Sequence, residues 1–283
     1  MADVTLQAPG RSPHYTKPQR IEVNGLPVAY RRKGERRGEG PPTVFLHGAG
    51  TTQLWLPFYE RMAAAVDFVA PEHPGFGGTP LPDWVEGFDD LVLHYRDLLD
   101  AFAFDQVHLI GFSLGGWIAA ELGVFYPERL ASLTLITPVG LRVPGHPLPD
   151  LFRMPPENIP ELLYNGRAQD YPDFLLDPHD VEAVVQGYTE ASTFARLAWN
   201  PRHDRKLARR LGRIRCRALV VEPDEDQLVP RQHFEAWVEL LPDARLERVR
   251  GAAHPTGHGL IVQEPDQAAA LITRFIQEQE AGS

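Results

Sequence analysis

Hydrophobic residues along the chain fall into short apolar runs that alternate with segments of helical spacing. The apolar runs predict strands at residues 21–23, 26–30, 43–46, 66–70, 106–110, 130–137, 218–221 and 245–249. Helical spacing is found at residues 52–65, 88–104, 117–126, 181–198, 232–241 and 266–279. Asn24-Gly25 lies between the first two runs and predicts a hairpin turn. The later alternation predicts a parallel sheet with right-handed crossovers and helices on both faces.

The alternation breaks between residues 138 and 213, a segment that contains ten prolines, several aromatic residues and no strand-like run. We expect this segment to be a mainly helical insertion over the strand ends, with one or two of its aromatic side chains facing a pocket. The predicted division is a loose arm at residues 1–19, a core at 20–139 and 213–283, and a cap at 140–212.

Composition excludes several classes of protein. The chain has 28 Lys and Arg against 38 Asp and Glu, a formal charge of −10, which disfavours nucleic-acid binding. The basic segment 202–217 carries Leu and Ala at helical spacing, which is typical of a solvated helix face. One cysteine, Cys216, cannot form an intramolecular disulfide, and this fits a reducing compartment. No signal-peptide pattern and no run near the ~18 apolar residues of a membrane helix is visible. We therefore expect a cytoplasmic protein without membrane association.

The candidate chemistry centres on the segment Gly111-Phe112-Ser113-Leu114-Gly115-Gly116. It follows an apolar strand-like run and precedes a run of helical spacing. A serine between two glycines at a strand-to-helix switch is the pattern of a nucleophile elbow. Such a turn exposes the serine hydroxyl, requires small residues two positions before and after it, and directs the N-terminus of a helix at its oxygen.

Three more loops follow predicted strands. His47-Gly48-Ala49-Gly50 follows one strand, the acidic loop 222–226 follows another, and Gly251-Ala-Ala-His254-Pro-Thr-Gly-His258 follows the last. A serine hydroxyl needs a base, and the base needs an orienting carboxylate. Because sites in such sheets form at the carboxyl ends of the strands, these loops can supply both. The chain order is then serine, acid, histidine.

This ordered set resembles the α/β-hydrolase superfamily over residues 20–280, and Pro74-Gly75-Phe76-Gly77 and Asp226-Gln-Leu-Val-Pro230 extend the likeness. The resemblance implies an α/β fold with an eight-stranded, mostly parallel sheet, helices on both faces and a helical cap inserted after strand 6. It also implies that Ser113 is the nucleophile. The backbone N–H groups of Ala49 and Leu114 would form the oxyanion hole.

The resemblance places the acid at Asp226, ahead of a Val-Pro pair, with Asp224 and Glu225 as adjacent rivals. His254 directly follows the last strand, 28 residues after Asp226, and is the favoured base. His258 remains the alternative, because it follows a glycine and Pro265 lies seven residues beyond it. Among the other histidines, His47 resembles a buried family residue that holds the oxyanion loop, and His73 is expected to be exposed.

These residues predict a carboxylesterase-like serine hydrolase of a small apolar ester, thioester or lactone, acting through an acyl-enzyme on Ser113. The alternatives are a carbon–carbon bond hydrolase of the meta-cleavage type, a perhydrolase-like enzyme, and a non-catalytic ligand-binding protein of the same fold. Relatives of the meta-cleavage type usually carry Asn where this chain has Phe112, and a longer Gly-rich loop. Without His-x-x-x-His or paired cysteines, no metal and no cofactor is expected. The expected partner is a small-molecule substrate, and the expected state is a monomer or homodimer.

Overall fold

The computed structural model describes residues 12–35 and 40–281. An eight-stranded sheet forms its centre, in the order β1-β2-β4-β3-β5-β6-β7-β8. The strands are β1 (Gln19–Val23), β2 (Leu26–Lys33), β3 (Thr43–Leu46), β4 (Phe68–Pro71), β5 (Val107–Phe112), β6 (Leu130–Ile136), β7 (Ala218–Glu222) and β8 (Ala244–Arg248). Strand β2 pairs antiparallel with both neighbours, and the other pairs are parallel. The expected fold class and the hairpin at Asn24-Gly25 are confirmed.

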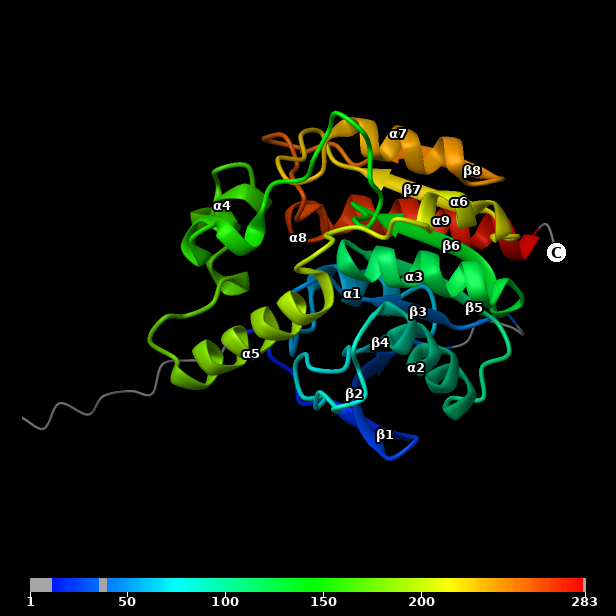
Figure 1. Cartoon of the computed structure of the whole chain (residues 1–283), viewed down its shortest axis with the longest axis horizontal. Coiled ribbons are helices and arrows are strands. Elements are labelled where there is room, and N and C mark those ends of the chain that lie inside the picture. Colours follow the sequence, from blue (N-terminus) through cyan, green and yellow to red (C-terminus); the bar gives the residue numbers. More distant parts are fainter. Residues whose placement is uncertain (1–11, 36–39, 282–283) are drawn as a thin grey trace, which may run out of the picture.

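Helices cover both faces of the sheet (Figure 1). They are α1 (Pro57–Ala63), α2 (Phe88–Ala101), α3 (Leu114–Phe125), α4 (Ile159–Leu163), α5 (Val181–Ala198), α6 (Leu207–Arg210), α7 (Arg231–Leu240), α8 (Leu260–Gln263) and α9 (Pro265–Ala281). Buried side chains of α2, α3 and α7 belong to one apolar cluster, and those of α1, α8 and α9 belong to a second. The sheet therefore has an apolar layer on each face.

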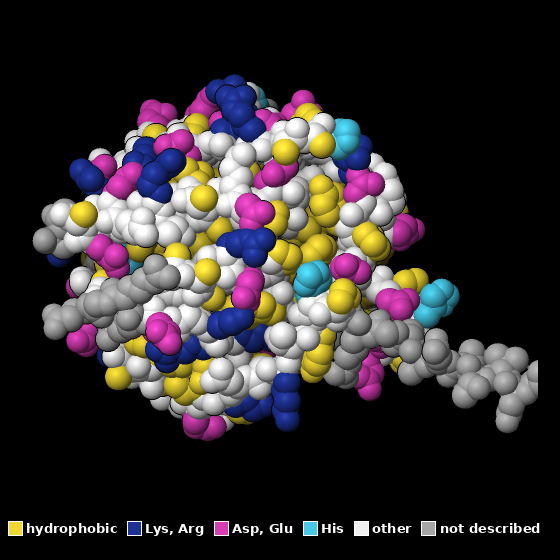
Figure 2. Space-filling view, turned by 180° about the vertical axis from the view of Figure 1, so that it is seen from behind, with side chains coloured by type: hydrophobic (Ala, Val, Ile, Leu, Met, Phe, Trp, Pro, Cys, Tyr) yellow, Lys and Arg dark blue, Asp and Glu magenta, His cyan; other side chains and the backbone are white. Residues whose placement is uncertain are grey.

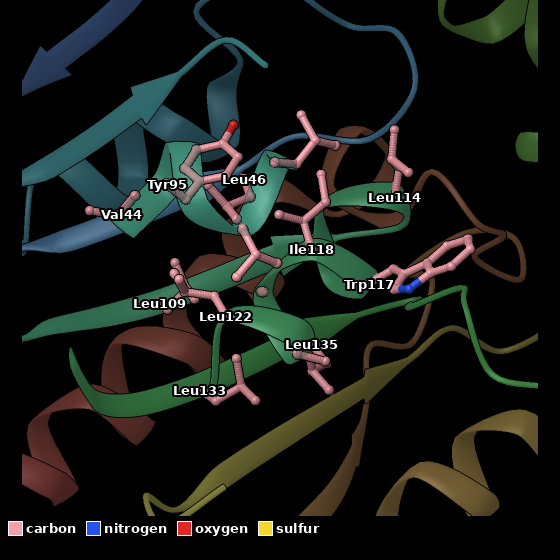
Figure 3. Close-up of a cluster of buried hydrophobic side chains, with 14 of the residues drawn as sticks. Val44, Leu46, Tyr95, Leu109, Leu114, Trp117, Ile118, Leu122, Leu133 and Leu135 are labelled. Atoms are coloured by element: carbon pink, nitrogen blue, oxygen red, sulfur yellow. The ribbon is translucent and has the colours of Figure 1, made fainter. Parts of the chain in front are cut away.

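Helix α3 lies at the centre of the first layer. It is apolar except for Glu121, and every residue from Leu114 to Val124 is buried, as expected of a helix enclosed by protein. Figure 3 shows side chains of α3 in one cluster with those of β3, β5 and β6 and with Tyr95 of α2. The labelled members of this cluster are Val44, Leu46, Tyr95, Leu109, Leu114, Trp117, Ile118, Leu122, Leu133 and Leu135. This packing fixes the helix that begins directly after Ser113.

Residues 137–217, here called the insert, connect β6 to β7 without a strand. Besides α4, α5 and α6 they hold short 3-10 turns at Leu151–Arg153, Pro156–Asn158, Ala168–Asp170, Pro172–Phe174 and Leu211–Arg213. Helix α5 has the bounds that the sequence pattern predicted, and it begins where the Asp180 carboxylate accepts the N–H groups of Glu182 and Ala183. Helices α4 and α5 lie to one side of the sheet (Figure 1).

Residues 1–11 of the expected N-terminal arm lie outside the described residues. Residues 12–18 contact the core: the Thr16 N–H donates to Gln53 O over 3.1 Å, and the Trp55 N–H donates to His14 O over 2.7 Å. On the face seen in Figure 2, acidic and basic side chains are interspersed. In the described part of the chain, no helix is long and apolar enough to cross a membrane.

Candidate active site

Ser113 occupies a strained turn between β5 and α3. Its backbone has φ 53° and ψ −112°, in the positive-φ region that non-glycine residues rarely adopt. The flanking glycines leave no room for a side chain, since a Cβ on Gly111 would lie 2.4 Å from Gly115 O, and one on Gly115 would lie 2.1 Å from Leu46 O. The sequence pattern at this turn therefore reflects real steric limits, and Ser113 stands at the N-terminus of a buried helix.

A hydrogen-bonded chain links Ser113 to His258 and Asp226. His258 Nε2 lies 2.9 Å from Ser113 Oγ, and His258 Nδ1 lies 2.9 Å from Asp226 Oδ2. The second oxygen of Asp226 accepts the N–H groups of Leu228 and Val229, each over 2.8 Å. Because the carboxylate accepts at Nδ1, the imidazole carries its proton there and Nε2 is free to accept from the serine.

The expectation that His254 contacts Ser113 is wrong, since His258 holds that position and His254 is exposed. After β8 the chain turns back on itself instead of running on towards the serine. The turn is closed by Thr256, whose Oγ1 donates to Val249 O over 2.6 Å, and by Asp224, which accepts the Gly251 N–H over 2.8 Å. The residues around His254 form this turn, and His258, which follows it, therefore lies next to the serine.

The two rivals of Asp226 lie elsewhere. The Asp224 carboxylate is occupied by the N–H groups of Gly251 and Thr256, at 2.8 and 3.3 Å, and so organises the turn that carries His258. Glu225 is exposed. Of the three neighbouring acids, the one that the sequence favoured is the one bonded to the histidine.

Ala49 and Leu114, the expected oxyanion-hole residues, both line the cavity beside Ser113. The loop that carries Ala49 is fixed by His47, which is buried as expected. His47 Nδ1 lies 2.6 Å from Gly48 O, and His47 Nε2 accepts the His73 N–H over 3.0 Å. Burial lowers the pKa of His47 to about 4, so the ring stays neutral and can accept at Nε2.

His73 was expected to be exposed, and this is wrong: its side chain is fully buried. His73 Nε2 lies 2.7 Å from His47 O and donates to that carbonyl, which leaves Nδ1 to accept from the Tyr95 hydroxyl. Burial lowers the pKa of His73 well below its usual value, in agreement with this neutral tautomer. The dipeptide His73-Pro74 gave no sign of this role, because its partners are distant in sequence.

A cavity opens above Ser113, with an empty volume of about 950 Å³ including its mouth. Most of its wall is apolar. The wall residues from the core include Phe112, Leu114, Trp117, Leu228, Ile261 and Val262. The insert contributes Leu148, Leu151, Phe152, Ile159, Leu163, Tyr164, Phe194 and Ala198. Three of the aromatic residues of the insert thus face the cavity, while Tyr188 and Trp199 are exposed.

Few polar side chains reach this cavity besides Ser113 and His258. They are Thr51, Tyr164 and Arg202. Arg202 forms an ion pair with Asp150, and burial raises the pKa of Tyr164 to about 12, so that its hydroxyl remains protonated. The pocket therefore suits an apolar ligand with a small number of polar groups.

The insert also touches the loop that carries His258. Leu163 O accepts the Gly259 N–H over 3.0 Å, and the Asn165 amide donates to Pro255 O over 3.3 Å. The fit is tight, since a Cβ on Gly259 would lie 2.4 Å from a ring carbon of Tyr164. Both neighbours of the histidine are glycine because the insert lies directly against them.

In residues 12–35 and 40–281, no group of three or more His, Cys, Asp or Glu side chains is arranged to hold a metal ion. The chemistry described above uses only protein groups: a hydroxyl, an imidazole, a carboxylate and backbone amides. The hydroxyl, the imidazole and the carboxylate are arranged as in a Ser-His-Asp triad.

Comparison with known proteins identifies the family. The sequence profile of the Alpha/beta hydrolase family matches residues 43–271. The chain belongs to this family. Several of its relatives are named hydrolases, which supports the conclusion that this protein is a hydrolase too.

Two of these relatives match over most of their length. The 2-hydroxy-6-oxo-6-phenylhexa-2,4-dienoate hydrolase of Comamonas testosteroni is 28% identical, with 86% of this chain and 90% of the relative covered. A poly(3-hydroxyalkanoate) depolymerase of Ectopseudomonas oleovorans is 27% identical, with coverage of 84% and 85%. A solved meta-cleavage product hydrolase of Pseudomonas fluorescens shares the fold at a TM-score of 0.73 and 21% identity, with coverage of 93% and 98%.

Proposed function

We propose that this protein hydrolyses an ester, thioester or lactone with an apolar acyl part, through an acyl-enzyme on Ser113. The observation that carries the proposal is the hydrogen-bonded chain Ser113–His258–Asp226 at the floor of an apolar cavity. His258 replaces His254 as the proposed base. Residues 140–212 are proposed to act as the cap that closes this cavity.

In the first half-reaction, Ser113 Oγ attacks the carbonyl carbon while its proton moves to His258 Nε2. Asp226 holds the imidazole orientation and stabilises the imidazolium that forms. The carbonyl oxygen becomes an oxyanion, for which the Ala49 and Leu114 N–H groups are the proposed donors. Collapse of the tetrahedral intermediate breaks the bond to the leaving group, which departs with the proton from His258.

In the second half-reaction, a water molecule gives a proton to His258 Nε2 and attacks the acyl carbon. The bond to Ser113 Oγ then breaks, the serine recovers its proton from the imidazole, and the carboxylic acid product leaves. No oxidant, metal or cofactor enters this sequence of steps. The same residues serve in both halves.

The cavity wall supports an apolar acyl group as the main determinant of affinity. Aliphatic and aromatic side chains of both core and insert surround the space above Ser113. Burial of a hydrocarbon chain contributes about 0.8 kcal/mol per CH₂ group, so longer acyl chains should bind more tightly until they fill the cavity. One relative is named a poly(3-hydroxyalkanoate) depolymerase, and this name is compatible with an ester substrate.

A carbon–carbon bond hydrolase is the second candidate, and the observation in its favour is the name of the dienoate hydrolase relative. Such a dienoate is an anion, for which Arg202 is a candidate partner in the cavity wall. Two observations weigh against it. Arg202 is already paired with Asp150, and Phe112, which lies against the His258 ring, offers no polar group.

The test compares p-nitrophenyl esters of increasing acyl length with 2-hydroxy-6-oxo-6-phenylhexa-2,4-dienoate, using the wild-type protein and Ser113→Ala. We expect ester turnover that is lost in the variant, together with an acyl adduct on Ser113 seen by mass spectrometry. Cleavage of the dienoate at a higher kcat/KM than any ester would favour the second candidate. Absence of any turnover and of labelling by a fluorophosphonate would favour a ligand-binding protein.

A further inference from the structure

One of the contacts between helix α5 of the insert and the core is made by a buried carboxylate; Thr193 and Arg196 of the same helix also bond to core carbonyls. Glu190 is 7% exposed, and its Oε1 accepts hydrogen bonds from Thr52 Oγ1 at 2.5 Å and from Gly77 N at 2.9 Å. Gln186, one turn earlier on the same helix, also donates to Oε1 over 2.9 Å. The carboxylate therefore joins the insert to two loops of the core.

These three donors are uncharged, and another carboxylate, Glu72, lies nearby. Burial raises the pKa of Glu190, and Glu72 raises it further. Burying an acid in such surroundings is costly, and an apolar side chain of similar size would avoid that cost. The hydrogen bonds from Thr52, Gly77 and Gln186 lower the pKa and offset part of this cost, so what the acid provides at this place is an acceptor for donors of the core.

The loop that Glu190 reaches is the one that carries Ala49. Thr51 and Gln53, both non-glycine residues, have φ of 56° and 62°. Such conformations persist only where surrounding contacts impose them. One contact comes from the core, where Glu72 accepts the Gln53 N–H over 3.0 Å. A second comes from residue 16, whose N–H donates to Gln53 O, and a third comes from the insert, through Thr52 and Glu190.

We propose that Glu190 is a positioning residue for the oxyanion hole: through Thr52 it holds the loop 48–53 in the strained shape that directs the Ala49 N–H at the carbonyl oxygen. The role rests on the proposed function, because it presumes that Ala49 is an oxyanion donor. It makes the insert part of the catalytic apparatus as well as a wall of the pocket. Glu190 itself lies behind the loop and touches no reacting atom in this scheme.

The proposal predicts a defect in transition-state binding rather than in substrate binding. Glu190→Leu removes the acceptor, Thr52→Val removes the donor, and Glu190→Gln keeps an oxygen that can accept the same bonds. Loss of a whole oxyanion donor costs about 10²–10³ in rate, so a displaced donor should cost about 10-fold in kcat, with KM nearly unchanged. Glu190→Gln should stay close to wild type. Ser192→Ala, on the exposed side of the same helix, is the matched control.

The measurements are kcat and KM on a p-nitrophenyl ester and the binding of an alkylboronic acid, whose serine adduct carries an oxygen anion into the hole. We expect Glu190→Leu and Thr52→Val to weaken boronic acid binding by the factor lost from kcat. The double variant should lose no more than either single variant. Values equal to those of Ser192→Ala would overturn the proposal, and Thr52→Val decides alone if Glu190→Leu fails to fold. If the wild-type protein hydrolyses no ester, the proposed function fails. Boronic acid binding by the wild type and the variants would then still show whether Glu190 positions the loop 48–53.

Discussion

Asp226→Asn tests the central hydrogen-bonded chain with the smallest change of shape. In the wild type, one carboxylate oxygen accepts from Leu228 and Val229, and the other accepts from His258. An asparagine keeps its oxygen on the two backbone N–H groups, because turning the amide over would leave both donors unpaired at about 1–3 kcal/mol each. Its NH₂ group then faces His258 Nδ1.

The imidazole can meet this new donor only by accepting at Nδ1. Its proton then moves to Nε2, where it points at Ser113 and blocks the transfer of the serine proton. A triad locked in the wrong tautomer loses about 10⁴ in kcat. At 1.36 kcal/mol per factor of ten, this is about 5 kcal/mol of transition-state stabilisation.

The assay is steady-state hydrolysis of a p-nitrophenyl ester, with circular dichroism to confirm folding. Glu225→Gln provides the matched control, since it removes an equal charge from an exposed neighbour in the same loop. The control should behave as wild type. A loss of less than about 10-fold in folded Asp226→Asn, against the factor of about 10⁴ expected, would refute this account of the proton path.

Three further changes test other parts of the structure. His258→Ala should lower kcat by about 10⁴–10⁶ while His254→Ala leaves it unchanged, and equal losses in both would contradict the corrected assignment. Burial raises the pKa of Glu121 on α3 to about 8 from 4.5. The folded chain therefore holds a proton that the unfolded chain releases, and stability falls as pH rises from 4.5 to about 8. Thermal melts of Glu121→Gln should show a higher Tm than wild type above pH 8 and little difference near pH 4.5, whereas parallel curves would exclude this titration. Gly259→Ala should destabilise the protein by about 1–3 kcal/mol in urea unfolding, because its Cβ meets the Tyr164 ring. Adding Tyr164→Leu should recover part of the lost stability. An unchanged urea midpoint in Gly259→Ala would show that the Tyr164 ring moves aside without cost.

Local signals in the sequence account for most of the fold. Asn24-Gly25 specified the hairpin, and the apolar run ahead of Gly111 specified the central strand, because turn geometry and side-chain periodicity act over a few residues. The elbow at Ser113 could also be predicted, since its glycines are required by close contacts within the motif and with the adjacent strand. Asp226 followed from its place after β7.

The histidine that bonds to Ser113 could not be predicted in the same way. Distance along the chain from β8 favoured His254, but the path of the loop is set by its hydrogen bonds to Asp224, which belongs to another segment. The prediction of an exposed His73 was wrong for the same reason: this side chain bonds to Tyr95, which is on α2. The walls contributed by the insert were also beyond sequence reasoning, because short turns rich in proline carry no periodicity that shows which side faces the pocket.

The contact between the insert and the glycines beside His258 has a consequence for engineering. Leu163, Tyr164 and Asn165 fit a loop that has no side chain at 257 or 259, so neither partner can be replaced without the other. Chimeras that take this region from a relative would mismatch the loop unless they also take residues 255–259 from the same donor. Recombination libraries for altered specificity should therefore always exchange the two segments together, although some 90 residues of chain separate them.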